Sequence, residues 1–436
     1  MNFKPQLQTL ANKIKLVTLD LPQSQSVTVL IMIKIGSRYE SDRLAGISHF
    51  LEHLVFKGTQ KYPTAFDLTS KVDSIGAEFN AFTGKEYTGF YIKSASAHLQ
   101  LSLDILSQLV FHPTLPEKEM EKEKGVICEE INMREDMPMA KISEIYELLL
   151  YGNTSLGREI AGYKKTVKAM KKEDFINYLQ TWYKPERMIL GIVGGLHIKE
   201  TPCLKNFTVK NNSSSIKDAP LALTFNQEKP QLRLEYKKTE QAHFCLGVRA
   251  FPHAHKDRYV MAVLATILGG NMSSRLFTEV REKRGLAYYI KSDINTYFDH
   301  GYFVSQAGVD INKAEEAIKV ILEEYNKISN VPTQGWSASG RKSQNSKLEL
   351  NRAKEYIKGK LALSLEDSHG MASLFVEDLL LDGKVRTPAE IIKSVEKVTI
   401  DDISRVAKTI FVNQGLNLAV IGPYKNKEKF AKLLKL

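Results

Sequence analysis

Residues 46–59 of the chain form the stretch GISHFLEHLVFKGT. Apolar residues recur through it at the spacing of a helix face, and this pattern predicts a helix from about Leu44 to Phe56. Asp42 is the expected N-cap, and Gly58 is the expected stop. A short helix of this composition would bury one apolar face and leave its polar residues together on another.

Two histidines and one glutamate share the polar side of this helix. His49 and His53 stand one turn apart on the same face, so both imidazoles can reach one metal ion. Glu52 lies beside the same ion, in an order that places two zinc ligands and a general base on one helix. Zinc would need a third protein ligand and leave one position for water. The alternative is a pair of half-buried histidines on an amphipathic helix.

A second segment, residues 115–134 (LPEKEMEKEKGVICEEINMR), offers the missing ligand. It begins with Pro116 and acidic residues that suit a helix N-terminus. Its apolar residues fall in one broad sector that also contains two glutamates, Glu123 and Glu130; the apolar members are Met120, Val126, Ile127, Ile131 and Met133. Glu129 falls on the outer face. A carboxylate on a buried face is costly unless it is paired or binds a metal, so we expect Glu130 to be the third ligand.

Glu123 lies two helical turns before Glu130, about 10 Å along the axis. We therefore expect it to support the metal ligands or to handle protons rather than to bind the ion directly. The alternative is a buried salt bridge to a nearby Lys or Arg.

The two segments together resemble the pitrilysin/insulinase family of zinc metallopeptidases, the inverzincins. The family pattern is His-x-x-Glu-His, about seventy residues, Glu, six residues, Glu; here 69 residues separate His53 from Glu123 and six separate Glu123 from Glu130. Residues 269–277 (GGNMSSRLF) and 281–288 (REKRGLAY) resemble the family's C-terminal signature. The likeness runs from about Leu16 to Gly422. The length resembles that of short bacterial members and of mitochondrial processing peptidase subunits.

The resemblance implies a zinc-dependent endopeptidase that holds one zinc ion per chain. It would hydrolyse peptides or unfolded polypeptide segments inside a chamber formed by facing domains, with Glu52 as the base. Residues 78–83 (EFNAFT) resemble the family's substrate-binding edge strand, in which Asn80 and Ala81 would lie next to the scissile bond. The alternative for these residues is an ordinary turn between a helix ending near Ile75 and a strand at 87–95.

Arg281 and Tyr288 match an Arg/Tyr pair of the family that is suited to an oxyanion or a substrate carbonyl. They lie in the half without the metal motif, so the resemblance implies a site completed between two chains. A homodimer is expected and a heterodimer is the alternative. Arg281 could instead form a surface salt bridge with Glu279 or Glu282. The competing function is a non-catalytic or partner-dependent subunit of a heterodimeric processing-peptidase-like complex.

Internal repetition divides the chain in two. Each half opens with a strand before a helix, near Val27 and Phe244, and closes with a similar strand, near Gly195 and Gly422. We expect an α+β fold of two homologous α/β sandwich domains, each with helices packed on a mostly antiparallel sheet. The expected domains are 1–208 and 223–436, joined by a polar linker at 209–222. A Ser/Gly/Lys-rich stretch at 331–349 predicts a surface loop, with partner binding as an alternative role.

Composition limits the other possibilities. The net charge is +11, but no nucleic-acid-binding motif accompanies it, so nucleic-acid binding is the weaker interpretation. Three scattered cysteines predict reduced thiols rather than disulfides. The sequence shows no signal peptide, transit segment or membrane span, and cytoplasmic residence is expected.

Overall fold

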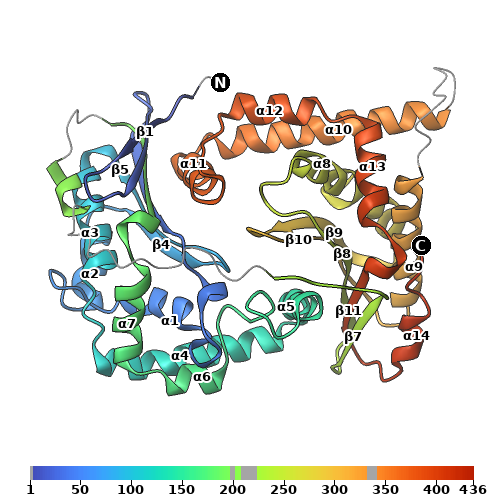
Figure 1. Cartoon of the computed structure of the whole chain (residues 1–436), viewed down its shortest axis with the longest axis horizontal. Helices are drawn as coiled ribbons and strands as arrows, with labels where there is room; N and C mark the ends of the chain where they lie inside the picture. Colours follow the sequence, from blue (N-terminus) through green and yellow to red (C-terminus); the bar gives the residue numbers. More distant parts are fainter. Residues whose placement is uncertain (1–2, 197–201, 208–222, 331–340) are drawn as a thin grey trace. The chain divides into compact units, whose positions relative to one another are not determined.

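The computed structural model describes residues 3–196, 202–207, 223–330 and 341–436. The chain forms two compact units (Figure 1). Unit 1 contains residues 1–133, 158–221 and 362–388; unit 2 contains 134–157, 222–361 and 389–436. The sequence predicts a single division at 209–222. Instead, residues 134–157 of the first half belong to unit 2, and residues 362–388 of the second half belong to unit 1. The expected linker itself lies outside the described residues.

Unit 1 is built on a six-stranded sheet. Its strand order is β1 (Gln6–Thr9), β2 (Lys15–Asp20), β6 (Met188–Gly194), β3 (Ser26–Ile33), β5 (Thr88–Ala95) and β4 (Glu78–Thr83). Strands β2 and β6 are parallel, and every other neighbouring pair is antiparallel. Strand β4 lies at one edge, so one side of its backbone has no strand partner within the sheet.

Unit 2 repeats this sheet. Its five strands follow the order β7 (Gln231–Tyr236), β11 (Leu416–Gly422), β8 (Gln241–Ala250), β10 (Gly301–Asp310) and β9 (Ala287–Thr296). The first pair is parallel and the other pairs are antiparallel, the same directions as in β2-β6-β3-β5-β4. The shared order and directions confirm the predicted α+β fold with an internal duplication.

Helices cover both faces of each sheet. Those of unit 1 are α1 (Ile47–Val55), α2 (Ala65–Asp73), α3 (Leu99–Phe111), α4 (Glu117–Asp136), α6 (Lys164–Ala169), α7 (Lys172–Trp182) and α11 (Ser368–Asp382). Those of unit 2 are α5 (Pro138–Tyr151), α8 (Arg258–Gly269), α9 (Ala314–Ser329), α10 (Arg341–Ser364), α12 (Pro388–Glu396), α13 (Ile400–Ile410) and α14 (Lys427–Ala431). A π-helical turn, Phe277–Glu282, precedes β9.

The exchanged helices occupy equivalent places in the two units. In unit 1, α11 packs on β3 and β6, and the Ser368 hydroxyl lies 2.8 Å from that of Thr28. The alternate residues Val27 and Val29 face the core that contains α1 and α3. In unit 2, α5 packs on β8 and β11, where Cys245 joins its cluster. Because both faces are covered, the central strands are mostly apolar, and polar residues such as Thr28 of β3 are few.

The prediction of a surface loop at 331–349 is wrong in part. Residues 341–349 form the first turns of α10, because Lys, Gln, Leu and Glu there favour a helix despite two serines. Residues 331–340 lie outside the described part. Cys128 and Cys245 are buried free thiols. Within the described residues, no helix is both long enough and apolar enough to cross a bilayer.

Candidate metal centre

Two of the candidate metal ligands, His49 and His53, project from α1 because of the way this helix packs. Its buried apolar residues recur at helical spacing, and they are Ile47, Phe50, Leu51, Leu54 and Val55. The Phe50 ring packs edge-to-face on the Phe175 ring, with 4.9 Å between the ring centroids. The three residues His49, Glu52 and His53 repeat the same spacing on another side, where His49 is buried and the other two are half-buried. Core packing thus fixes which way the polar residues point.

His49, His53 and Glu130 form a cluster whose possible ligand atoms all lie within 4.8 Å of one another. Glu130 Oε2, on α4, lies 3.4 Å from His49 Nε2 and 3.7 Å from His53 Nε2. Ligands bound at about 2.1 Å to a tetrahedral ion stand about 3.4 Å apart. Two imidazoles and a carboxylate at this separation fit a zinc ion that keeps a fourth position for water.

Glu123 lies behind His53, on the side away from Glu130. Its Oε1 lies 2.9 Å from His53 Nδ1, and its Oε2 lies 2.7 Å from Lys57 Nζ. Burial would raise the pKa of Glu123, but the bonds from His53 and Lys57 outweigh burial and lower it. An ionised Glu123 accepts a hydrogen bond from the Nδ1–H of His53, which leaves Nε2 without a proton and able to bind a metal. The salt-bridge alternative is also realised, since the same carboxylate pairs with Lys57.

Glu52 is held by the edge strand. The Thr83 hydroxyl of β4 donates a 2.6 Å hydrogen bond to Glu52 Oε2. Burial raises the pKa of Glu52, while the Thr83 bond and the nearby His53 partly offset this effect. A carboxyl group with a raised pKa is a better proton acceptor than an ordinary glutamate.

Asn80 and Ala81 lie on β4, which forms the edge of its sheet, so the alternative of an ordinary turn is excluded. The Ala81 N–H donates to the Asn80 side chain at 2.9 Å rather than to β5. Directly after β4, the Gly84 N–H points inward and donates to Tyr87 O at 2.8 Å. Alternation therefore turns the backbone of Phe79, Ala81 and Thr83 outward.

Arg281 and Tyr288 lie together in unit 2. Arg281 lies near the end of the π-helical turn, and its guanidinium lies 4.9 Å from the Phe277 ring centroid and 5.7 Å from that of Tyr288. Tyr288 is 73% exposed on β9. Glu279 pairs with Lys283 and Arg284 instead, so the alternative salt bridge of Arg281 with Glu279 is not formed.

Comparison with known proteins assigns the chain to a family. Residues 15–164 match the model described as insulinase (peptidase family M16), and residues 169–335 match the one described as the peptidase M16 inactive domain. A Bacillus subtilis protein named an uncharacterized zinc protease is 34% identical over 96% of this chain and 98% of its own. The chain belongs to the M16 peptidase family.

A second relative and a solved structure are also similar to this chain. A Streptomyces coelicolor protein, also named an uncharacterized zinc protease, is 33% identical over 96% of this chain and 90% of its own. The crystal structure of a Helicobacter pylori protease superposes with a TM-score of 0.87 at 23% identity, covering 97% of this chain and 100% of that one. The match to an inactive domain agrees with a second half in which residues 264–270 (LATILGG), at the place of the metal motif, contain no His, Cys, Asp or Glu.

The burial of residues on helix α4 agrees with one expectation from the sequence, for its glutamates, and differs from another, for two of its apolar residues. Glu129 is exposed whereas Glu130 is half-buried and Glu123 is buried, as its helical face predicted. Val126 and Met133, however, are 51% and 56% exposed and lie outside the core. The apolar sector is broader than the buried face, because the metal-site side of α4 stays open around Glu130.

Three residues of the M16 site were not anticipated: Lys57, Thr83 and Glu40. Lys57 and Thr83 stand within segments already quoted, but their partners, Glu123 and Glu52, are distant in sequence. The expected N-cap, Asp42, instead begins a short 3₁₀ turn, and α1 starts at Ile47 after Gly46. A carboxylate from upstream, Glu40, takes the capping role.

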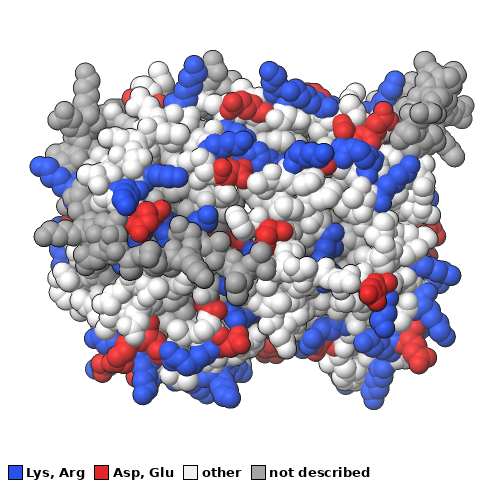
Figure 2. All heavy atoms as spheres, in the orientation of Figure 1, with Lys and Arg blue, Asp and Glu red and all other residues white. Residues whose placement is uncertain are grey.

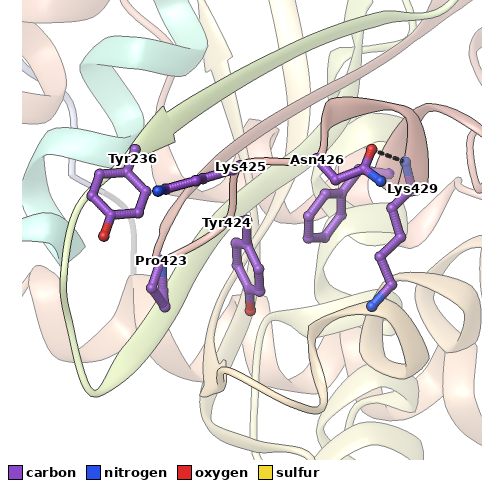
Figure 3. A pocket seen from close by; sticks show the side chains of 7 residues that line it. Tyr236, Pro423, Tyr424, Lys425, Asn426 and Lys429 are labelled. Carbon is purple, nitrogen blue, oxygen red and sulfur yellow. Dashed lines mark hydrogen bonds between the residues drawn. The ribbon is translucent and has the colours of Figure 1, made fainter.

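A surface hollow in unit 2 offers a contrast (Figure 3). Its lining includes Tyr236, Tyr424, Lys425 and Lys429, and no His, Cys, Asp or Glu is among the lining residues. Lys425 Nζ lies 5.7 Å from the Tyr236 ring centroid. This hollow therefore has no ligands for a metal. On the face drawn in Figure 2, acidic side chains lie among the many basic ones.

Proposed function

We propose that this M16 member is a zinc-dependent endopeptidase. The observation that carries the proposal is that the side chains of His49, His53 and Glu130 converge on one point. Glu52 lies on α1, the helix that carries the two histidines. These three ligands would hold one zinc ion per chain. When bound there, zinc supplies a water of lowered pKa and polarises a carbonyl group.

Glu52 performs the proton transfers in this proposal. It accepts a proton from the attacking water and returns it to the departing amine, so its carboxylate is regenerated each cycle. The Thr83 hydroxyl keeps Oε2 of Glu52 oriented, which leaves Oε1 for the water. Glu123 keeps His53 in the tautomer that a metal needs.

The substrate is proposed to bind as an added strand on β4. The outward-facing backbone at Ala81 can pair with an extended peptide, and such pairing uses main-chain groups common to all sequences. This mode favours peptides and unfolded segments, because a folded protein seldom presents a free strand. Asn80 would release the Ala81 N–H as the peptide binds.

Arg281 and Tyr288 are proposed to bind the carbonyl oxygen on which charge develops during cleavage. Both donors lie in unit 2, whereas the metal ligands lie in unit 1. We propose that the site is completed between two copies of the chain, which together enclose a chamber.

Metal analysis combined with peptide cleavage tests the proposal. The change Glu52→Gln should leave zinc bound and lower kcat by about 10²–10⁴-fold, because only the proton acceptor is lost. The matched control is Glu129→Gln, an exposed change beside a ligand on α4. Zinc-dependent cleavage at the wild-type rate by the Glu52 variant would refute the assigned base, and zinc binding without cleavage by the wild type would favour a non-catalytic subunit.

A further inference from the structure

The metal helix α1 begins without a side-chain cap of its own. Its N-cap residue, Gly46, has a left-handed conformation (φ 96°). A Cβ at this position would lie 2.6 Å from Ala161 O, so only glycine fits. The first N–H groups of a helix nevertheless need acceptors. Another part of the chain must supply them.

Glu40 supplies these acceptors. Its Oε2 accepts from Gly46 N–H at 2.8 Å, and its Oε1 accepts from Ser48 N–H at 2.8 Å and from the Ser48 hydroxyl at 2.7 Å. Glu40 is only 7% exposed. A carboxylate at a helix N-terminus also interacts favourably with the helix dipole. One buried side chain thus binds the first turn of α1 at three points.

The network continues to a second helix. The Ser48 hydroxyl donates to Glu40, so the Tyr178 hydroxyl, 2.7 Å away on α7, is the group that donates to Ser48. Tyr178 is 4% exposed and its ring belongs to the core of unit 1. The first turn of α1 is therefore tied to a residue whose own position is fixed by packing.

Glu40 is itself anchored. The guanidinium of the buried Arg158 donates to the Glu40 carbonyl oxygen at 2.9 Å and to the Ser37 carbonyl oxygen at 3.4 Å. These bonds hold the backbone of the segment that carries Glu40. The carboxylate consequently reaches α1 from a fixed support rather than from a free loop.

We propose that Glu40 is a positioning residue for the metal centre. Side chains on a helix follow one another at about 100° of rotation, so fixing Ser48 fixes the direction of His49 and, through the helix, of His53. By holding the first turn, the Glu40 carboxylate sets the rotation of α1 about its axis. This inference rests on the proposed zinc site and adds a residue that contacts neither the metal ligands nor the substrate.

Two measurements on the full chain test this role without substrate. The first is the zinc affinity, measured by competition with a chelator, and the second is amide hydrogen exchange of residues 46–55 in the metal-free protein. Glu40→Gln offers one acceptor oxygen in place of two, so we expect zinc affinity to fall by about tenfold or more and exchange at 46–49 to accelerate. Tyr178→Phe should change both in the same direction but less.

The control is Glu324→Gln, which alters a buried, paired carboxylate of unit 2 and should change neither quantity. Wild-type zinc affinity and exchange in both the Glu40 and Tyr178 variants would overturn the proposal. If Glu40→Gln does not fold, the Tyr178 variant alone decides. A chain that binds zinc and loses affinity on Glu40→Gln, yet cleaves no peptide, would refute the proposed function and leave this inference standing.

Discussion

His53 is held from both sides of its imidazole ring. Glu123 Oε1 faces Nδ1 at 2.9 Å, and Glu130 Oε2 lies 3.7 Å from Nε2. Lys57 in turn pairs with Glu123 at 2.7 Å. Lys57, Glu123 and His53 thus form a chain of contacts, the relay: Lys57 keeps the Glu123 carboxylate ionised, and this carboxylate orients His53. The two glutamates of α4 thus serve one histidine in different ways.

This relay predicts that Glu123→Gln weakens zinc binding. The neutral amide orients His53 less strongly, and we expect the affinity to fall by about 10–100-fold, measured by chelator competition. Lys57→Met should have a smaller effect of the same sign. Lys122→Met breaks an exposed pair with Glu119 on the same helix and should have none. Unchanged affinity in the Glu123 variant would show that His53 needs no charged partner at Nδ1.

Glu40 predicts a pH-dependent stability. Burial raises its pKa to about 7, against hydrogen bonds from Ser48 and Gly46 and the charge of Arg158, which lower it. The folded protein thus holds this proton more tightly than the unfolded chain, whose pKa is near 4.5. The proton on Glu40 therefore stabilises the folded protein. Its contribution to the free energy of unfolding is complete below pH 4.5 and is lost as the pH rises through 7.

Chemical unfolding of the metal-free protein at pH 5 and pH 8 measures this effect. The free energy of unfolding of the wild type, relative to that of Glu40→Gln, should fall by roughly 2–3 kcal/mol between these values. A difference between the two proteins that stays constant with pH would mean that Glu40 has an ordinary pKa.

At the scale of elements, strand β4 connects the proposed base, Glu52, with the proposed substrate strand. Its Thr83 bonds Glu52, and two residues earlier Ala81 turns its N–H outward. The same strand therefore holds the side chain of the proposed base and presents an outer backbone edge that has no strand partner within the sheet. A peptide bound along β4 would therefore lie close to Glu52, the proposed base.

The change Ala81→Pro tests this edge. Proline removes the outward N–H but none of the bonds from β4 to β5, and edge strands tolerate it at such positions. We expect KM for a peptide substrate to rise by roughly tenfold, the loss of one backbone hydrogen bond of about 1.4 kcal/mol, with zinc affinity unchanged. An unchanged KM would place the substrate elsewhere.

Local periodicity predicted much of this fold and site. The helix that carries His49 and His53, the strand that closes each half and the choice of Glu130 over Glu129 by helical face all depend on short-range pattern. The cap of α1 did not follow from pattern, because Glu40 folds back over a left-handed glycine. The helix at 341–349 was missed because serine and glycine dominate the preceding residues. Thr83 and Lys57 act through tertiary contacts that no local pattern records.

At the scale of the whole molecule, the proposed site needs residues from both units. Two inactive variants can test whether one chain or two supply them. Glu52→Gln keeps Arg281 and Tyr288, whereas Arg281→Ala keeps the metal ligands and the base. If the site forms between two chains, one of the two sites in a mixed dimer has every residue intact.

We therefore expect the two variants, each nearly inactive alone, to recover activity when mixed under conditions that allow exchange of subunits. Random pairing at equal amounts would give about a quarter of the wild-type activity per chain. A size measurement on the same samples checks that dimers are present. No recovery despite exchange would show that each chain completes its own site.

The exchange of α5 and α11 has a consequence for how the protein is made. Residues 362–388, which cover one face of the unit 1 sheet, follow nearly all the rest of the chain in order of synthesis. On the ribosome, the face of the unit 1 sheet formed by β3 and β6 therefore has no α11 to cover it while most of the second sheet is being translated. The N-terminal unit reaches its final form only after α11 has emerged, so neither unit matures independently of the other.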